Sequence, residues 1–509
     1  MDPRRGAAAL TSATLGVAVL SALVLLLGGC ASPGEPLTRA QPRDARSLGL
    51  DGPGEPAGEG ALAATPWWTA WGDAQLASLV ERALQAQPSL LAAQARALRA
   101  EALARQTEGA GQAQARLSVE ASRQRYTAQG LVPPPLAGSV LNSGTVQAGV
   151  AWGPDWYGAQ AAALAAARGQ ASAARADAAL AAQGLAAQVA RGYVALARVL
   201  AQREVAARAL AQREQMWVLT RQRVAAGLDT QVERVQSQAS LPDMRAQIEA
   251  LDEQAALGRH QLAVLSGQAP AALDGLHPSL DALDLPGLPA RLGADLLARR
   301  ADVQAARWRV EAAGQEVALA RTRFYPDVNL SAFIGLNAIG LDHVFEAASR
   351  QAGVTPALHL PLFEGGQLRA QLRGREAELN AAVAQYDGTV LTAVREAADA
   401  LVSLQSLARQ RDEQARALAG AEQAHALAAQ RHRAGLGSYL VVLNAETQWL
   451  AQRRQAVDLR ARELDAGVAL ALSLGGGWAV VPPTNTARTD ASPDFPPAAA
   501  VVQAAAGTP

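Results

Sequence analysis

The sequence predicts a mainly α-helical fold with a small β part, built from two copies of one long unit. The stretch from Gly158 to Gly267 is echoed in the second half of the chain by the stretch from Gly365 to Gly476. Ala, Leu, Gln, Arg and Glu dominate the composition, which is typical of long helices. Four short segments instead alternate apolar and polar residues, as strands do. We therefore expect duplicated helical hairpins joined to a few strands.

The repeat is clearest in its middle, where Arg223–Leu228 aligns with Arg431–Leu436 at constant offset. A repeat of this length is a tandem copy of half a domain and not a short solenoid unit. The chain therefore has internal pseudo-symmetry, which suits rings and tubes better than active-site clefts.

Composition and charge exclude several classes of function. The chain has 46 basic and 46 acidic residues, so no bulk field attracts nucleic acid. It contains no lysine, which excludes P-loop and Schiff-base chemistry. Its single cysteine, Cys30, excludes an intrachain disulfide or a multi-thiolate metal site. The six histidines are scattered, so we expect no enzyme activity, no metal and no cofactor.

The N-terminus has the pattern of a secretory signal peptide, which we assign to residues 1–29. Two arginines precede the apolar run Ala7–Leu27, and Leu-Gly-Gly-Cys follows. This ending resembles a bacterial lipobox, in which Cys30 becomes the lipidated first residue; a plain signal peptide is the alternative. Several acyl chains would anchor the protein firmly. Residues 30–64, rich in Pro, Gly and Ala, are expected to form a tether.

Four amphipathic strands are expected at about 115–125, 145–153, 327–337 and 354–362. After Cys30 no apolar run approaches the roughly 20 residues that a spanning helix requires. Transmembrane barrels show the same alternation, with aromatic residues at both rims. Girdle aromatics are expected at Trp152, Trp156, Tyr157, Phe324 and Tyr325.

Alternation alone does not separate a membrane sheet from a small soluble sheet with one solvated face. Four strands cannot close a barrel, and open edges are not tolerated in lipid. A barrel would therefore need several chains, and three chains would supply twelve strands.

The remaining sequence predicts long helices. The spans between Pro154 and Leu241 and between Pro361 and Val481 contain no proline, so the first helix of each repeat could run about 70 residues, or roughly 100 Å. Each should end at a glycine, Gly227 or Gly435, and a shorter partner helix should follow. A solid bundle or stalk is the alternative to a wall of hairpins packed side by side.

Five motifs occur in order along the chain: Pro66–Trp68, Leu297–Val303, Phe324–Leu330, Leu360–Gly366 and Leu474–Trp478. Together they resemble the TolC-like outer membrane factor family, especially its NodT-type lipoprotein branch. The resemblance covers roughly residues 65 to 478. It divides them into a first repeat at 65–267, a joint at 268–290 and a second repeat at 291–478, with a disordered tail at 479–509. Ala301 departs from the family pattern, in which proline is usual.

The resemblance implies a homotrimer, in which twelve strands form one outer-membrane β-barrel and twelve helices form a periplasmic α-helical tunnel. Such proteins are passive exit ducts for small molecules and drugs in tripartite efflux systems. The expected partners are a periplasmic adaptor, an inner-membrane transporter of RND type and outer-membrane lipid. The alternatives are a type I secretion duct or, from another class, a periplasmic adaptor or stalk lipoprotein.

The resemblance also places the two hairpin tips at the periplasmic end. We expect Arg223, Gly227, Arg431 and Gly435 to contact the adaptor, although the glycines also cap helices.

Past each turn, one helix face should point toward the pore entrance. This face carries Asp229 and Glu233 in the first repeat and Val441 and Asn444 in the second. The family often has Asp where this chain has Asn444, so cation selectivity does not follow from the resemblance.

Overall fold

The computed structural model describes residues 33, 35, 37, 40–42, 66–131, 133–285 and 299–476. The predicted signal peptide, Cys30 and the predicted tail lie outside the described residues. All described residues belong to one compact unit, Met1–Trp478.

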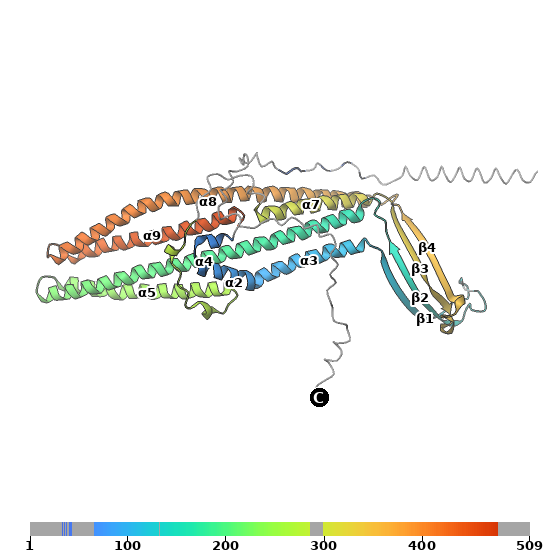
Figure 1. The fold of residues 1–509 in the computed structure, drawn as a ribbon, viewed down its shortest axis with the longest axis horizontal. Helices are drawn as coiled ribbons and strands as arrows, with labels where there is room; N and C mark the ends of the chain where they lie inside the picture. The colour runs from blue at the N-terminus through green and yellow to red at the C-terminus, as the bar shows by residue number, and fades with distance from the viewer. Residues whose placement is uncertain are drawn as a thin grey trace, which may run out of the picture. The chain divides into compact units, whose positions relative to one another are not determined.

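The first repeat contains a 3₁₀ turn, two shorter α-helices, a strand pair and one long helical hairpin (Figure 1). Its elements are η2 (Trp67–Trp71), α2 (Ala74–Ala86), α3 (Pro88–Ala110), β1 (Gln114–Arg125), β2 (Val140–Trp152), α4 (Ala159–Ala225) and α5 (Gln231–Leu265).

The second repeat has the same plan after a joint with two single-turn helices. These are η3 (Pro270–Leu273) and η4 (Leu280–Ala282). The repeat itself consists of α7 (Ala301–Thr322), β3 (Asp327–Ile339), η5 (Leu341–His343), η6 (Ala347–Ser349), β4 (Arg350–His359), α8 (Gln367–Arg433) and α9 (Tyr439–Ser473).

The two hairpins match residue for residue in length. Helices α4 and α8 each have 67 residues, and α5 and α9 each have 35. Both turns pass through a left-handed glycine, Gly227 at φ 72° and Gly435 at φ 76°. A residue with a side chain is strained in this region, so glycine ends each long helix where the chain must reverse.

Alanine and glycine let the helices pack closely. A Cβ at Gly169 of α4 would lie 3.0 Å from the Cβ of Ala312 in α7. Helix α4 contacts α3, α5, α7 and α9, and α8 contacts α7 and α9, so the two repeats share one helical layer. The hairpin tips lie at the opposite end of this layer from the strands (Figure 1). No helix among the described residues is long and apolar enough to cross a membrane.

The largest core cluster lies where the two repeats meet. Trp67 packs edge-on against Trp68 and Trp71, at ring-centroid distances of 5.7 and 5.5 Å. Next to them, Asp73 caps α2 and accepts a 2.7 Å hydrogen bond from the Tyr193 hydroxyl of α4. This core joins the start of the first repeat to its long helix.

The strands form one antiparallel sheet in the order β1-β2-β3-β4. Two strands differ from the predicted ranges. Strand β2 begins at Val140, not near 145, because Val140–Gly144 pair with the far end of β1. Strand β4 spans Arg350–His359, not 354–362: His359 pairs with Asp327 at the start of β3, and Pro361 has no N–H to continue the ladder.

Candidate functional sites at the sheet and the hairpin tips

One face of the sheet is apolar and exposed. Leu117 of β1 and Ile334 of β3 lie in the same cross-strand row, and they are 72% and 68% exposed. Val119, Val354 and Leu358 on the same face are exposed to a similar degree. An apolar surface of this kind marks contact with a membrane or another protein. A soluble sheet would instead cover this face with its core, which the described residues do not do.

The opposite face is polar, and its side chains bond to one another across the strands. These bonds satisfy polar groups within the sheet and make this face suitable for lining water. The pairs are Ser122 with Ser143 (2.7 Å), Asn337 Nδ2 donating to Thr145 Oγ1 (2.8 Å) and Gln351 Nε2 donating to Gln147 Oε1 (3.3 Å).

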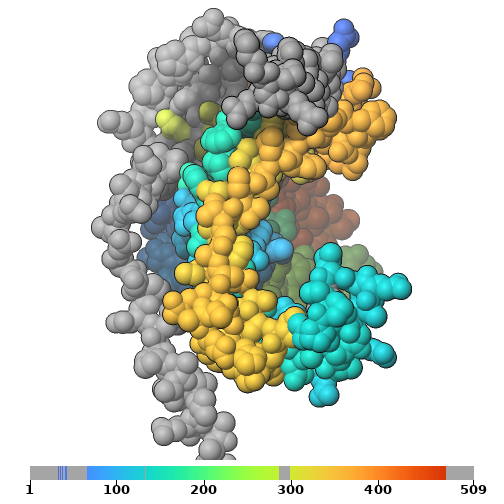
Figure 2. Space-filling model, turned by 90° about the vertical axis from the view of Figure 1, so that its right-hand side faces the viewer, coloured from blue at the N-terminus to red at the C-terminus, as the bar shows by residue number. Residues whose placement is uncertain are grey.

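Two loops connect the strands at the end of the sheet far from the helices (Figure 1), and this end of the molecule faces the viewer in Figure 2. The N–H of Gly340 donates to the carbonyl of Asn142 (2.7 Å), and Val344 packs where a Cβ on Gly144 would otherwise lie. These contacts hold the β3–β4 loop against β2.

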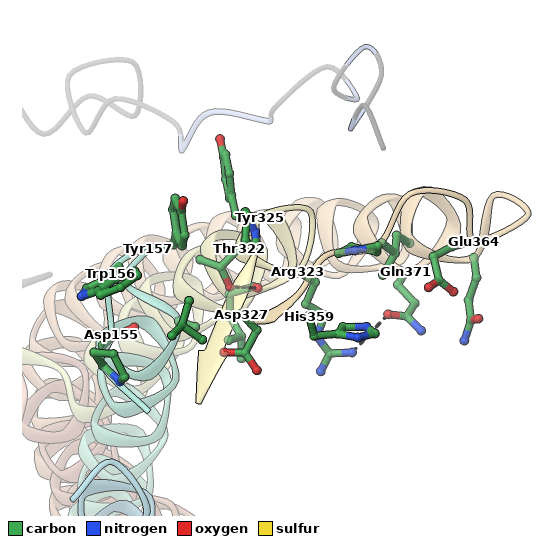
Figure 3. Close-up of a pocket in the computed structure, with 18 residues that line it drawn as sticks. Asp155, Trp156, Tyr157, Thr322, Arg323, Tyr325, Asp327, His359, Glu364 and Gln371 are labelled. Carbon is green, nitrogen blue, oxygen red and sulfur yellow. Dashed lines mark hydrogen bonds between the residues drawn. The ribbon is translucent and has the colours of Figure 1, made fainter. Parts of the chain in front are cut away.

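Four of the five predicted girdle aromatics are exposed at the junction between sheet and helices. They are Trp152, Trp156, Tyr157 and Tyr325. The rings of Tyr157 and Tyr325 stack at 4.9 Å, and Figure 3 shows them side by side. Phe324 differs from the prediction. It is only 4% exposed and packs in a cluster with Val317 and Leu372. It therefore packs between helices and not at a membrane surface.

A cavity of about 470 Å³ opens beside these aromatics (Figure 3). Its polar side chains hold the starts of the long helices. Asp155 accepts hydrogen bonds from the N–H groups of Gln160 (3.0 Å) and Ala161 (2.8 Å) in the first turn of α4. Arg323 Nη1 donates to Gln371 Oε1 in α8 (3.2 Å). These hydrogen bonds hold the first turns of α4 and α8 at the junction with the sheet.

At the first hairpin tip, Arg223 and Asp229 neutralise each other. Arg223 makes two hydrogen bonds to the Asp229 carboxylate, at 2.9 and 3.0 Å, and the two side chains are only 14% and 6% exposed. Hydrogen bonding to Asp229 raises the pKa of Arg223. Glu233 accepts from the N–H of Thr230 (2.8 Å) in a capping box that starts α5. Arg223, Asp229 and Glu233 therefore all have structural roles within the tip.

The second tip is built differently. His432 is fully buried, and its Nδ1 lies 3.0 Å from the carbonyl oxygen of Gly437. Arg431 is exposed, and among the described residues its side chain bonds to the carbonyl of Leu436, at 3.4 Å. Of the predicted pore-entrance residues, Val441 and Asn444 are exposed on α9. The two tips are thus alike in backbone and unlike in charge.

A buried ion pair joins the two hairpins above the tips. Arg213 Nε of α4 lies 3.2 Å from both carboxylate oxygens of Glu446 in α9, with the side chains 10% and 7% exposed. Burial raises the pKa of Glu446, and its interactions with Arg213 and His425 act in the opposite direction. Sequence reasoning missed this pair. A signal existed, because Glu446 lies in the same helical stripe as Val442 and Trp449, which are buried.

The match to a known family decides what these surfaces belong to. A family model described as "Outer membrane efflux protein" matches residues 79–268 and 292–476, one match for each repeat. The chain belongs to the outer membrane efflux protein family. Its predicted fold, outer-membrane location and role in efflux are confirmed at the level of this family. The family is one of efflux proteins and not of enzymes.

Named relatives of this outer membrane efflux protein agree. The chain is 31% identical over 468 residues to "Multidrug resistance outer membrane protein MdtQ" of Escherichia coli O6:H1, and the match covers 90% of this chain and 97% of MdtQ. The crystal structure of the outer membrane protein VceC from Vibrio cholerae superposes with a TM-score of 0.75 at 37% identity, covering 81% and 98% of the two chains. The outer-membrane channel OprN superposes with a TM-score of 0.75 at 27% identity, covering 87% and 98%.

The efflux protein also holds part of its predicted tether against its helices. The N–H of Leu37 donates to Glu376 Oε2 (3.0 Å), and the N–H of Ala40 donates to Asn380 Oδ1 (2.9 Å). Glu376 is buried and pairs with Arg321 at 3.3 Å. Leu37 and Ala40 therefore lie against α8, and Ala40 also packs against the cluster that includes Val317 of α7. Among the described residues, no group of three or more His, Cys, Asp or Glu side chains could hold a metal ion.

Proposed function

We propose that this outer membrane efflux protein is a homotrimeric, passive exit duct of a tripartite efflux system. The observation that carries the proposal is the sheet. It has an exposed apolar face, a hydrogen-bonded polar face and two open edges, β1 and β4. A sheet of this kind is stable in lipid only if its edges are paired. Three copies closing a twelve-stranded barrel would pair them and leave a polar lumen.

The long hairpins would continue this lumen through the periplasm. Each chain contributes four helical segments beside one another, and three chains would complete a ring of twelve. The tips, with Arg223, Gly227, Arg431 and Gly435, would then face a periplasmic adaptor and, beyond it, an RND-type inner-membrane transporter. Small molecules, including drugs, are the cargo that the names of the MdtQ relatives support.

Two further features fit this assembly. A lipid on Cys30 would anchor the predicted tether, of which Leu37 and Ala40 bond to α8. At the pore entrance, Asp229 is paired with Arg223 and Glu233 caps a helix, while Val441 and Asn444 are uncharged. The duct should therefore select weakly by charge, since a narrow pore favours cations when it carries a ring of free acids.

Complementation tests this proposal. The chain is expressed in a host strain that lacks its own outer membrane efflux proteins, together with each adaptor–transporter pair of the source organism in turn. We expect at least one pair to restore drug resistance, and a Cys30→Ser variant to fractionate less firmly with the outer membrane. A trimer that reaches the outer membrane but restores resistance with no pair would refute the efflux role.

A further inference from the structure

The two hairpin tips provide an internal comparison. Arg223 and Arg431 occupy the same position in the repeat, in the last turn of α4 and of α8. Both precede a left-handed glycine and a second helix of equal length. Differences between their surroundings therefore reflect side chains and not backbone geometry.

At the first tip the guanidinium of Arg223 is already paired with a carboxylate. Asp229 binds Arg223 through two parallel hydrogen bonds, the geometry that an arginine and a carboxylate prefer. Arg223 also lies between the tips, because its Nη1 would be 4.0 Å from a Cβ on Gly435. An incoming carboxylate would have to displace Asp229 to bind here.

At the second tip the carboxylate is missing. Gly437 stands where the first repeat has Asp229, and its carbonyl faces the buried His432 ring. Arg431 keeps an exposed guanidinium, and within the part of the chain that the structure describes its side-chain hydrogen bond goes to the carbonyl of Leu436 and is 3.4 Å long. Arg433 is also exposed, and Leu436 beside it is 70% exposed. The second tip thus combines positive charge with an apolar side chain at its apex.

We infer that the second tip binds a carboxylate of the periplasmic adaptor through Arg431, and that the first tip does not bind one. This inference rests on the proposed function. An acidic side chain on the partner would take the place that Asp229 has at the first tip, and Leu436 would bury apolar surface next to it. The first repeat has Asp229 where the second has Gly437. This difference would make the two tips distinct docking surfaces.

The test supplies Arg431 with a carboxylate from its own chain. In Gly437→Asp, the new Cβ would lie 3.7 Å from Arg431 Cβ, an ordinary contact, and the backbone there is not left-handed. The added carboxylate should bind Arg431 as Asp229 binds Arg223. The probe is the purified adaptor from the pair that restores resistance, and its affinity for the trimer is measured at several salt concentrations.

We expect Gly437→Asp and Arg431→Gln each to weaken adaptor binding about tenfold or more and to reduce its salt dependence. Ala226→Asp is the matched control, because it adds the same charge at an exposed position of the first tip and should change affinity less than about twofold.

Three results would overturn the inference. Unchanged affinity in Gly437→Asp would show that Arg431 is not engaged. Equal weakening by Ala226→Asp would show a general effect of charge. Loss of the trimer in Arg431→Gln would show that Arg431 binds a neighbouring subunit. Each can occur while the wild-type chain still restores resistance, so the proposed function is judged separately.

Discussion

At the scale of single residues, the Arg213–Glu446 pair ties the first repeat to the second. Arg213 Nη1 also contacts the carbonyl of Ser240 in α5 at 3.4 Å, so three helices meet at this point. On the α9 side, Trp449 stacks against His425 of α8 at 5.3 Å, and Arg453 lies over the same indole. A polar cluster with members from α4, α5, α8 and α9 therefore lies between the two hairpins.

Removing one member of this pair should be costly, because it leaves the other charge buried. We expect Glu446→Ala to destabilise the protein by about 3–5 kcal/mol, seen as a lower thermal unfolding midpoint. The double variant Arg213→Met with Glu446→Leu should recover most of the loss, since apolar residues of similar size often replace a buried pair without cost. Equal stability of Glu446→Ala and wild type would mean that water reaches the pair.

At the scale of the element, the two faces of the sheet should respond oppositely to charge. Leu117→Arg places a charge on the apolar face, and Ser118→Arg places the same charge on the polar face of the same strand. At an exposed position in water, either change should matter little. If the apolar face contacts lipid, Leu117→Arg should cost up to about 2–4 kcal/mol. We expect it to lower the yield of assembled protein in outer-membrane fractions, with Ser118→Arg assembling normally.

The same elements show what the sequence could predict. The two 67-residue helices, α4 and α8, were predictable, because proline is absent from them and a glycine follows each one. Strand β1 was predictable from clean alternation. The ends of β2 and β4 were not, since Val140–Gly144 include Asn and Gly and become a strand only because β1 extends beside them. The ion pair at the first tip was also not predictable, because the sequence does not show that the Arg223 and Asp229 side chains contact each other.

At the scale of the whole molecule, the sheet is unfinished within one chain. Its four strands alternate in direction, so β1 and β4 run in opposite senses. Copies related by rotation would therefore bring β4 of one chain antiparallel to β1 of the next. Directly opposed residues in such a pair have Cα atoms about 4.5–5.5 Å apart, which a disulfide can bridge.

This geometry predicts covalent trimers. Ser118→Cys in β1 is combined with a cysteine at Gln351, Gly353 or Thr355 of β4, three positions on the same polar face. We expect one of the three combinations to oxidise into linked dimers and trimers in intact outer membranes, and the productive one gives the register. The control pairs Ser118→Cys with Asn337→Cys, since β3 lies two strands away from β1. Monomers alone from all three combinations, in protein that has reached the outer membrane, would exclude closure through these edges. Some other contact would then have to bury the apolar face of the sheet.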